Sequence, residues 1–99
     1  MATKTLNPVH PGEVLREEFI KPLGMSQRSF TATIGVTHTR LNQIVNEKRS
    51  VTADTALRLS RALGTTPEFW MNLQSKFDLD IGRDEAGDVI KQDVHPMKK

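Results

Sequence analysis

One stretch of the chain offers polar side chains suited to contact with nucleic-acid bases and contains no acidic residue. No aspartate or glutamate lies between Ser26 and Asn46. Leu41 and Ile44 lie at helical spacing and would face a core. The opposite face would then present short or planar polar side chains: Thr37, His38, Thr39, Arg40, Asn42 and Gln43. Such side chains can reach base edges when a helix lies in the major groove. The stretch therefore predicts a DNA-reading helix, whereas an ordinary solvated face would be rich in glutamate and lysine.

Residues 27–46 follow the plan of two short helices joined by a tight turn. Phe30 and Ile34 supply the apolar positions of the first helix. Gly35 lies where the turn needs a residue that tolerates a positive φ angle, and Val36 would fill the gap between the two helices. We therefore expect a helix-turn-helix whose second helix is free to enter DNA.

The distribution of charge indicates two surfaces with different partners. The formal net charge is +2, which is too small to indicate nucleic-acid binding by itself. Residues 25–50, however, hold four cations and a single acid, Glu47, whereas residues 77–99 hold six acids and four bases. A basic middle and an acidic end favour separate partners. The simpler alternative is charge scattered over a solvated surface.

Apolar residues at helical spacing predict five helices that position this stretch. The predicted helix starts carry a proline or a capping hydroxyl: Pro11, Ser26, Thr37, Thr52 and Thr66. Three of the predicted ends are glycines: Gly24, Gly35 and Gly64. The apolar stripe of the first helix is expected to consist of Val14, Leu15, Phe19 and Leu23.

These elements predict an all-α, five-helix domain over residues 11–78, preceded by an N-terminal arm over residues 1–10. Beyond Asp78 the chain is acidic and contains Gly82 and Gly87. We therefore expect residues 79–99 to form a flexible C-terminal tail, with a short extended piece at residues 89–90.

Composition argues against several other classes of protein. The chain has no cysteine, which excludes disulfides and thiolate metal sites, and no apolar run approaches the roughly 20 residues needed to cross a bilayer. The first seven residues lack the layout of a secretion signal, so we expect a cytoplasmic protein. His10, His38 and His95 are too scattered to predict a metal site, and nothing predicts a cofactor. Glu17 and Glu18 are adjacent and would point to different sides of a helix, so they cannot act on one substrate. The sequence also shows no serine or histidine in a nucleophile arrangement and no glycine-rich phosphate-binding loop, so we expect no enzyme activity.

A cluster of bulky side chains in the last helix predicts either core packing or a subunit interface. Its members lie at spacings of three and four: Phe69, Trp70, Leu73 and Phe77. Because residues 69–71 are all bulky, one small domain would not bury them all. We therefore expect part of this cluster to pack against a second copy in a two-fold dimer, with its DNA-reading helices about one DNA turn apart.

The motifs in this order resemble those of a known family. The helix-turn-helix motifs are Ser26-Gln27, Ile34-Gly35-Val36, Leu41-Asn42-Gln43-Ile44, Asn46 and Lys48-Arg49, and they are similar to the phage-repressor-like (Xre) group, whose fold is that of lambda repressor. Three further motifs narrow the resemblance to HigA-type antitoxins, also known as virulence-associated protein I. They are His10-Pro11-Gly12-Glu13, residues 53–62 with Leu63-Gly64, and residues 66–74 with Trp70 and Gln74. The resemblance covers about residues 7–77.

The resemblance implies a homodimeric repressor of its own operon that also neutralises a HigB-like, mRNA-cleaving toxin. By this resemblance, Gln27 would meet a phosphate or base at the start of its helix. Lys48 and Arg49 would meet the DNA backbone, while Thr37, His38, Thr39 and Gln43 would face bases. The full set of candidate DNA-binding residues is Gln27, Arg28, Thr37, His38, Thr39, Arg40, Gln43, Asn46, Lys48 and Arg49.

Two alternatives and one departure accompany this resemblance. The chain could be a free-standing or phage-derived repressor with no toxin partner, or a protein-interaction module without DNA binding. The departure is Thr31, where family members usually have alanine. A threonine there is expected to leave the fold intact and to shift the DNA-reading helix slightly.

Overall fold

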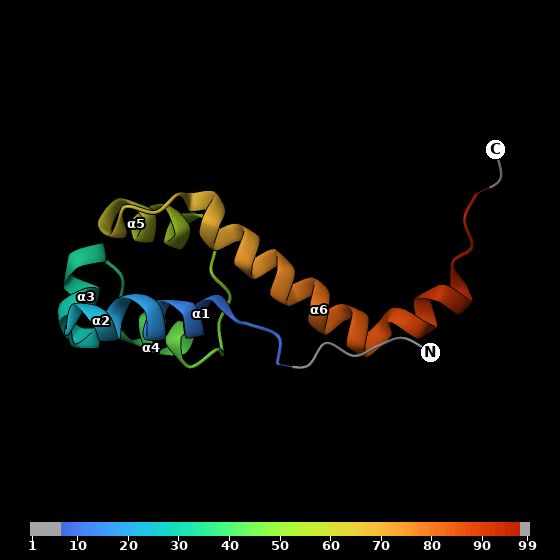
Figure 1. Cartoon of the computed structure of the whole chain (residues 1–99), viewed down its shortest axis with the longest axis horizontal. Coiled ribbons are helices and arrows are strands. Elements are labelled where there is room, and N and C mark those ends of the chain that lie inside the picture. The colour runs from blue at the N-terminus through green and yellow to red at the C-terminus, as the bar shows by residue number, and fades with distance from the viewer. Residues whose placement is uncertain (1–6, 98–99) are drawn as a thin grey trace.

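The structure is a computed structural model that describes residues 7–97, and it is built from helices (Figure 1). The first helix has three continuous parts: α1 (Pro11–Val14), the π-helical η1 (Leu15–Ile20) and α2 (Lys21–Leu23). The others are α3 (Gln27–Ile34), α4 (His38–Val45), α5 (Ala53–Leu63) and α6 (Pro67–Asp93). Residues 7–97 contain no strand. The prediction of an all-α fold with five helices is confirmed, while residues 1–6 of the expected arm lie outside the described residues.

The helix boundaries follow the capping residues of the sequence. Four helices begin after a hydroxyl side chain that accepts a hydrogen bond from the backbone N–H three residues on: Ser26, Thr37, Thr52 and Thr66. Three helices end at a glycine in the left-handed conformation: Gly24, Gly35 and Gly64. These predicted boundaries are therefore confirmed.

The π-helical stretch changes which side chains of the first helix reach the core. The N–H of Lys21 donates to the carbonyl of Arg16, five residues earlier, so this turn holds more residues than an α-helical one. The apolar stripe consequently rotates. Ile20 is buried, whereas Leu23, which we expected on the stripe, is 54% exposed.

The core lies between the helices and contains Trp70 at its centre. Its fully buried side chains come from every helical segment except α2, and the largest are Trp70, Phe30, Leu15, Leu41, Ile44 and Leu59. The indole Nε1 of Trp70 donates to Thr65 Oγ1 at 2.7 Å, and its ring packs against Phe19 and Phe69. Because the chain buries this side chain completely by itself, the expectation that Trp70 forms part of a dimer interface is corrected.

The last helix is much longer than expected. We predicted a flexible tail from residue 79 and an extended piece at residues 89–90, whereas α6 continues as one helix to Asp93. Gly82 and Gly87 lower helix propensity by roughly 1 kcal/mol each but do not adopt the left-handed conformation that ends a helix. Asp80 pairs with Lys76 at 2.9 Å and with Arg83 at 3.6 Å, spacings that stabilise a helix.

This extension gives the molecule an elongated shape. In Figure 1, α6 (orange to red) leaves the cluster formed by the other helices and continues beyond it. The principal extents are 53, 27 and 21 Å. Leu79, Val89 and Ile90 are exposed along the projecting half. The molecule therefore consists of a helical body and the protruding second half of α6.

His10 begins the first helix, a role that we did not predict. Its Nδ1 accepts a hydrogen bond from the N–H of Gly12 at 2.8 Å, so the imidazole acts as the cap. The ring is buried and meets the ring of Phe77 edge-on, with centroids 4.8 Å apart. Burial lowers the pKa of His10 below its usual value, while the nearby Glu47 and Asp78 partly oppose this effect.

We expect His10 to make the protein less stable in mild acid. Because the pKa is lower in the folded than in the unfolded chain, the unfolded chain binds the proton more readily. The contribution of neutral His10 to the free energy of unfolding is therefore complete above the pKa that it has in the unfolded chain, about 6.5. This contribution is lost as the pH falls through the lower pKa that His10 has in the folded chain. Urea unfolding at pH 7.5 and pH 5 should show this loss.

The matched variant is His10→Asn, whose side chain can also cap the helix but stays neutral. It should remove most of the pH dependence between these two values, since His38 and His95 remain in both proteins. An equal loss of stability in the wild type and in the variant would contradict the role given to His10.

Candidate nucleic-acid interface

The two helices α3 and α4 are joined by the turn that the sequence predicted. Gly35 has a φ of 71°, and its N–H donates to the carbonyl of Thr31 at 2.8 Å. Val36 packs against the core, and Thr37 then caps α4. Leu41, Ile44 and Val45 are buried, so α4 is held by one face only. These features define a helix-turn-helix unit over α3 and α4.

The opposite face of α4 is exposed and keeps much of its hydrogen-bonding capacity. His38, Thr39 and Gln43 are exposed, and their side chains make no hydrogen bond within the described part of the chain. Thr37 is exposed as well, but its hydroxyl accepts the N–H of Arg40 at 3.1 Å. The structure thus brings together the four residues expected to face bases, three of them with unused polar groups.

A chain of amide side chains links the start of α3 to this face. Asn42 Nδ2 donates to Gln27 Oε1 at 3.4 Å, and Asn46 Nδ2 donates to Asn42 Oδ1 at 3.1 Å. Gln27 and Asn46, both candidate DNA-binding residues, therefore lie beside the face through Asn42. Amides both donate and accept, so this row can meet phosphates as well as base edges.

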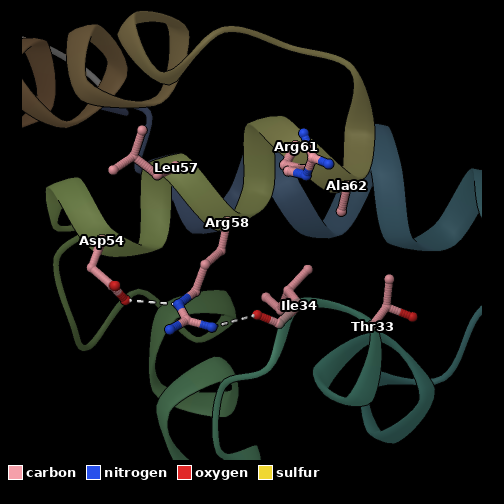
Figure 2. A pocket seen from close by; sticks show the side chains of 7 residues that line it. All are labelled: Thr33, Ile34, Asp54, Leu57, Arg58, Arg61 and Ala62. Carbon is pink, nitrogen blue, oxygen red and sulfur yellow. Dashed lines mark hydrogen bonds and ion pairs between the residues drawn. The ribbon is translucent and has the colours of Figure 1, made fainter.

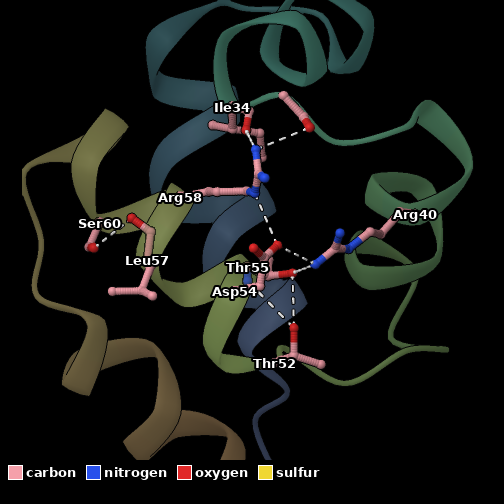
Figure 3. A network of polar contacts seen from close by, with 9 residues as sticks. Ile34, Arg40, Thr52, Asp54, Thr55, Leu57, Arg58 and Ser60 are labelled. Carbon is pink, nitrogen blue, oxygen red and sulfur yellow. Dashed lines mark hydrogen bonds and ion pairs between the residues drawn. The ribbon is translucent and has the colours of Figure 1, made fainter.

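Arg40 lies differently from what we expected. It is on the edge of α4 rather than on its free face, and its guanidinium is turned toward α5 (Figure 3). There Nη2 pairs with Asp54 Oδ2 at 3.0 Å and also donates to the hydroxyl of Thr55. In this structure the Arg40 side chain is therefore held by α5, and its contact with DNA stays a prediction.

Arg58, which binds the same carboxylate, connects α5 to the turn before α4. Arg58 Nε donates to Asp54 Oδ2 at 3.0 Å, and its Nη1 donates to the carbonyls of Ile34 and Gly35 at 3.1 and 3.2 Å (Figures 2 and 3). The guanidinium groups of Arg40 and then Arg58 hold the pKa of Asp54 below its usual range. Arg58 thus satisfies carbonyls at the end of α3, which have no partner within the helix.

On its other side, α4 is seated against the first helix at very short range. A Cβ atom added to Gly12 would lie only 1.8 Å from the carbonyl oxygen of Ile44, so only glycine fits there. Arg16 Nη1 donates to the carbonyl of Val45 near the end of α4, and Arg16 Nη2 lies 3.8 Å from Glu47 Oε2. The position of α4 is therefore determined by contacts at both ends.

The remaining cations predicted to meet DNA are exposed. Arg28 lies in the first turn of α3, and Lys48 and Arg49 follow the end of α4. None of these three side chains has an ion pair within residues 7–97. The single acid nearby, Glu47, lies within ion-pairing distance of Arg16. The local charge available to a phosphate backbone is therefore positive.

Thr31, the departure noted above, is accommodated locally. It is buried, and its hydroxyl donates to the carbonyl of Arg28 at 2.6 Å. The polar group therefore needs no partner from α4, and the fold is unaffected, as expected.

The groove beside this unit is open and of mixed character (Figure 2). It has a volume of about 430 Å³ and is lined by Thr33, Ile34, Asp54, Leu57, Arg58, Arg61 and Ala62. Within residues 7–97, no three metal-ligating side chains lie close enough to hold an ion. None of the described helices is both long and apolar enough to cross a membrane.

Sequence reasoning missed the residues that hold α4 and the loop after it in place. Gly12, Arg58 and Gln74 act through contacts distant in sequence, and Gln74 Oε1 accepts the N–H of Val51 at 2.7 Å. All three residues lie in motifs of the family resemblance, but those motifs gave no physical reason for them.

Known proteins resemble the chain over most of its length. Residues 15–70 match the family described as "Helix-turn-helix". Virulence-associated protein I of Dichelobacter nodosus is 44% identical over 82% of this chain and 75% of its own length. The solved structure of antitoxin GraA in complex with its operator is 43% identical, with a TM-score of 0.91, and the match covers 100% of this chain and 99% of that one. Antitoxin HigA of Pseudomonas aeruginosa, solved with the higBA promoter, is 37% identical with a TM-score of 0.89. This match covers 92% of this chain and 99% of that one.

The chain therefore belongs to the helix-turn-helix family, in the group that includes virulence-associated protein I and the HigA antitoxins. This membership confirms the resemblance found in the sequence. It also agrees with the expectation that the chain is not an enzyme, since these relatives are helix-turn-helix proteins.

Proposed function

We propose that this chain binds operator DNA as a homodimer, represses its own operon and acts as the antitoxin of a HigB-like toxin. The observation that carries the DNA part is the exposed, acid-free face of α4, seated by Gly12 on one side and Arg58 on the other. The likeness to antitoxins solved with their operator or promoter supports the same role. The toxin partner rests on that likeness alone.

In this proposal, affinity and sequence choice come from different residues. Arg28, Lys48 and Arg49 neutralise phosphates and release counterions, which gives binding that weakens as salt rises. Thr39 and Gln43 read base edges, since their side chains hold no internal bond. The amide row of Gln27, Asn42 and Asn46 sets the register on the backbone.

The dimer contact is proposed to lie on the exposed apolar residues of α6. Of the residues predicted from the sequence, Trp70 is in the core, Leu73 and Phe77 are half-buried, and Phe69 is exposed. The projecting half adds Leu79 and Ile90, which are more than half exposed. Exposed apolar side chains gathered on one element are typical of interaction sites.

The first experiment is a fluorescence-anisotropy titration against the DNA upstream of the gene, beside a scrambled duplex, at two salt concentrations. Salt-dependent binding with at least about a thousandfold preference for the upstream DNA is expected of an operator protein. Weak and equal binding to both duplexes would refute the repressor and favour a protein-interaction module. Adding the neighbouring gene product would then distinguish an antitoxin from a free-standing repressor.

Two substitutions test the separation of affinity from specificity. Gln43→Ala should weaken operator binding by roughly 1–3 kcal/mol and leave scrambled binding unchanged. Arg49→Ala should weaken both equally and lower the salt slope by about one per chain. Gln92→Ala, an exposed glutamine near the end of α6, is the matched control for Gln43. Equal losses on both duplexes for Gln43→Ala would remove its role as a base reader.

A further inference from the structure

Arg40 is the one lysine or arginine of α4, and it lies beside the predicted base-reading face. It is three residues from Gln43, a spacing that makes them neighbours on a helix surface. An arginine in this position could bind a phosphate of any DNA sequence. In the structure its guanidinium is paired with Asp54 instead, at 3.0 Å.

Asp54 is itself held in place by further contacts. The oxygen that pairs with Arg40 also accepts from Arg58 Nε, and Arg58 is anchored to the carbonyls of Ile34 and Gly35. Arg40 has a second partner in the hydroxyl of the buried Thr55. The carboxylate is therefore a fixed partner for Arg40 and not a freely moving surface group.

The pair has little to contribute to folding. The side chains of Arg40 and Asp54 are 29% and 56% exposed, and ion pairs this accessible to water stabilise proteins only weakly. The larger consequence of this pair is electrostatic, because Asp54 neutralises the positive charge of Arg40 next to Gln43. An unpaired cation there would raise affinity for every DNA sequence and so reduce selectivity.

We propose that Asp54 is a specificity-determining residue that holds Arg40 away from the DNA backbone. This inference rests on the proposed DNA-binding function and deepens it. DNA phosphates must compete with the Asp54 carboxylate for Arg40, so random DNA gains no contact from this side chain. The operator is then selected by Thr39 and Gln43 against a low background of non-specific binding.

The test is Asp54→Asn, measured by anisotropy on operator and scrambled duplexes over a series of salt concentrations. The released Arg40 should raise affinity for the scrambled duplex about fivefold to tenfold at 0.1 M salt and make the salt slope steeper by about one per chain. Operator affinity should rise less, so the ratio of the two affinities falls. A purely structural role for Asp54 would not steepen the salt slope.

Two controls separate this effect from a general change in charge. Glu68→Gln removes an acid from the first turn of α6, as Asp54→Asn does from the first turn of α5, and it should leave the slope unchanged. In an Arg40→Gln background, Asp54→Asn should no longer raise scrambled binding. An equal rise in that background, or no rise in the wild-type background, overturns the proposal.

The variant Arg40→Gln alone gives a reading that does not depend on how Asp54→Asn folds. This variant should change the affinity for the scrambled duplex less than about twofold. If Arg40 already bound phosphates in the wild type, the affinity would fall about fivefold or more. Failure of the wild type to prefer the operator would refute the proposed function instead. The salt slopes on scrambled DNA would still report whether Asp54 restrains Arg40.

Discussion

Replacing Gly12 by alanine should destabilise the protein more than any other change of a single methyl group. The added Cβ would lie 1.8 Å from the carbonyl oxygen of Ile44 and 2.8 Å from its carbonyl carbon, and these are backbone atoms of α4. The first helix must therefore move away from α4. Overpacking of this kind costs roughly 3 kcal/mol or more, which lowers the melting temperature of a domain this size by at least about 10 °C.

Gly82→Ala is the matched control, because a Cβ at Gly82 meets nothing within 4 Å. In an exposed helix this change should raise stability by about 0.5–1 kcal/mol. Thermal unfolding followed by circular dichroism checks both variants. If Gly12→Ala unfolds at the wild-type temperature, the close approach of the first helix to α4 does not exist.

Trp70→Ala is the second change with a large expected effect. It removes the largest fully buried side chain, its contacts with Phe19 and Phe69, and its hydrogen bond to Thr65. Truncating a buried tryptophan costs about 3–5 kcal/mol, a large fraction of the stability of a small domain. Urea unfolding should therefore show a protein close to the limit of folding.

Comparing Trp70→Ala with Phe69→Ala distinguishes a core residue from an interface residue. Phe69→Ala, at an exposed neighbouring position, should cost less stability and, where Phe69 belongs to the dimer contact, should weaken the dimer in sedimentation equilibrium. Unfolding at two protein concentrations separates the two effects, since dimer stability depends on concentration. A Trp70→Ala chain that is fully stable but monomeric would return Trp70 to the interface.

Local chemistry made much of the fold predictable. Ser26, Thr37, Thr52 and Thr66 were recognisable as caps because each hydroxyl satisfies an N–H three residues away. Gly35 was recognisable because a positive φ favours glycine. These signals span only a few residues, so the sequence alone contains them.

Contacts between distant residues were not predictable in the same way. The residues around Arg40 do not indicate that Asp54, fourteen positions later, binds its guanidinium. Nothing around Gly12 shows that Ile44 would lie against it. The length of α6 was missed for a different reason, because glycines and acids are typical of a mobile tail, whereas here the ion pairs of Asp80 stabilise the helix.

The contact between Gly12 and Ile44 has a consequence for how this protein could diversify. It joins backbone to backbone, so the place where α4 rests is independent of the side chains on its outward face. Thr39 and Gln43 can be exchanged for other residues without moving the helix that bears them. New operator preferences are therefore accessible one substitution at a time on an unchanged scaffold, and an engineer could vary these two positions together as a library.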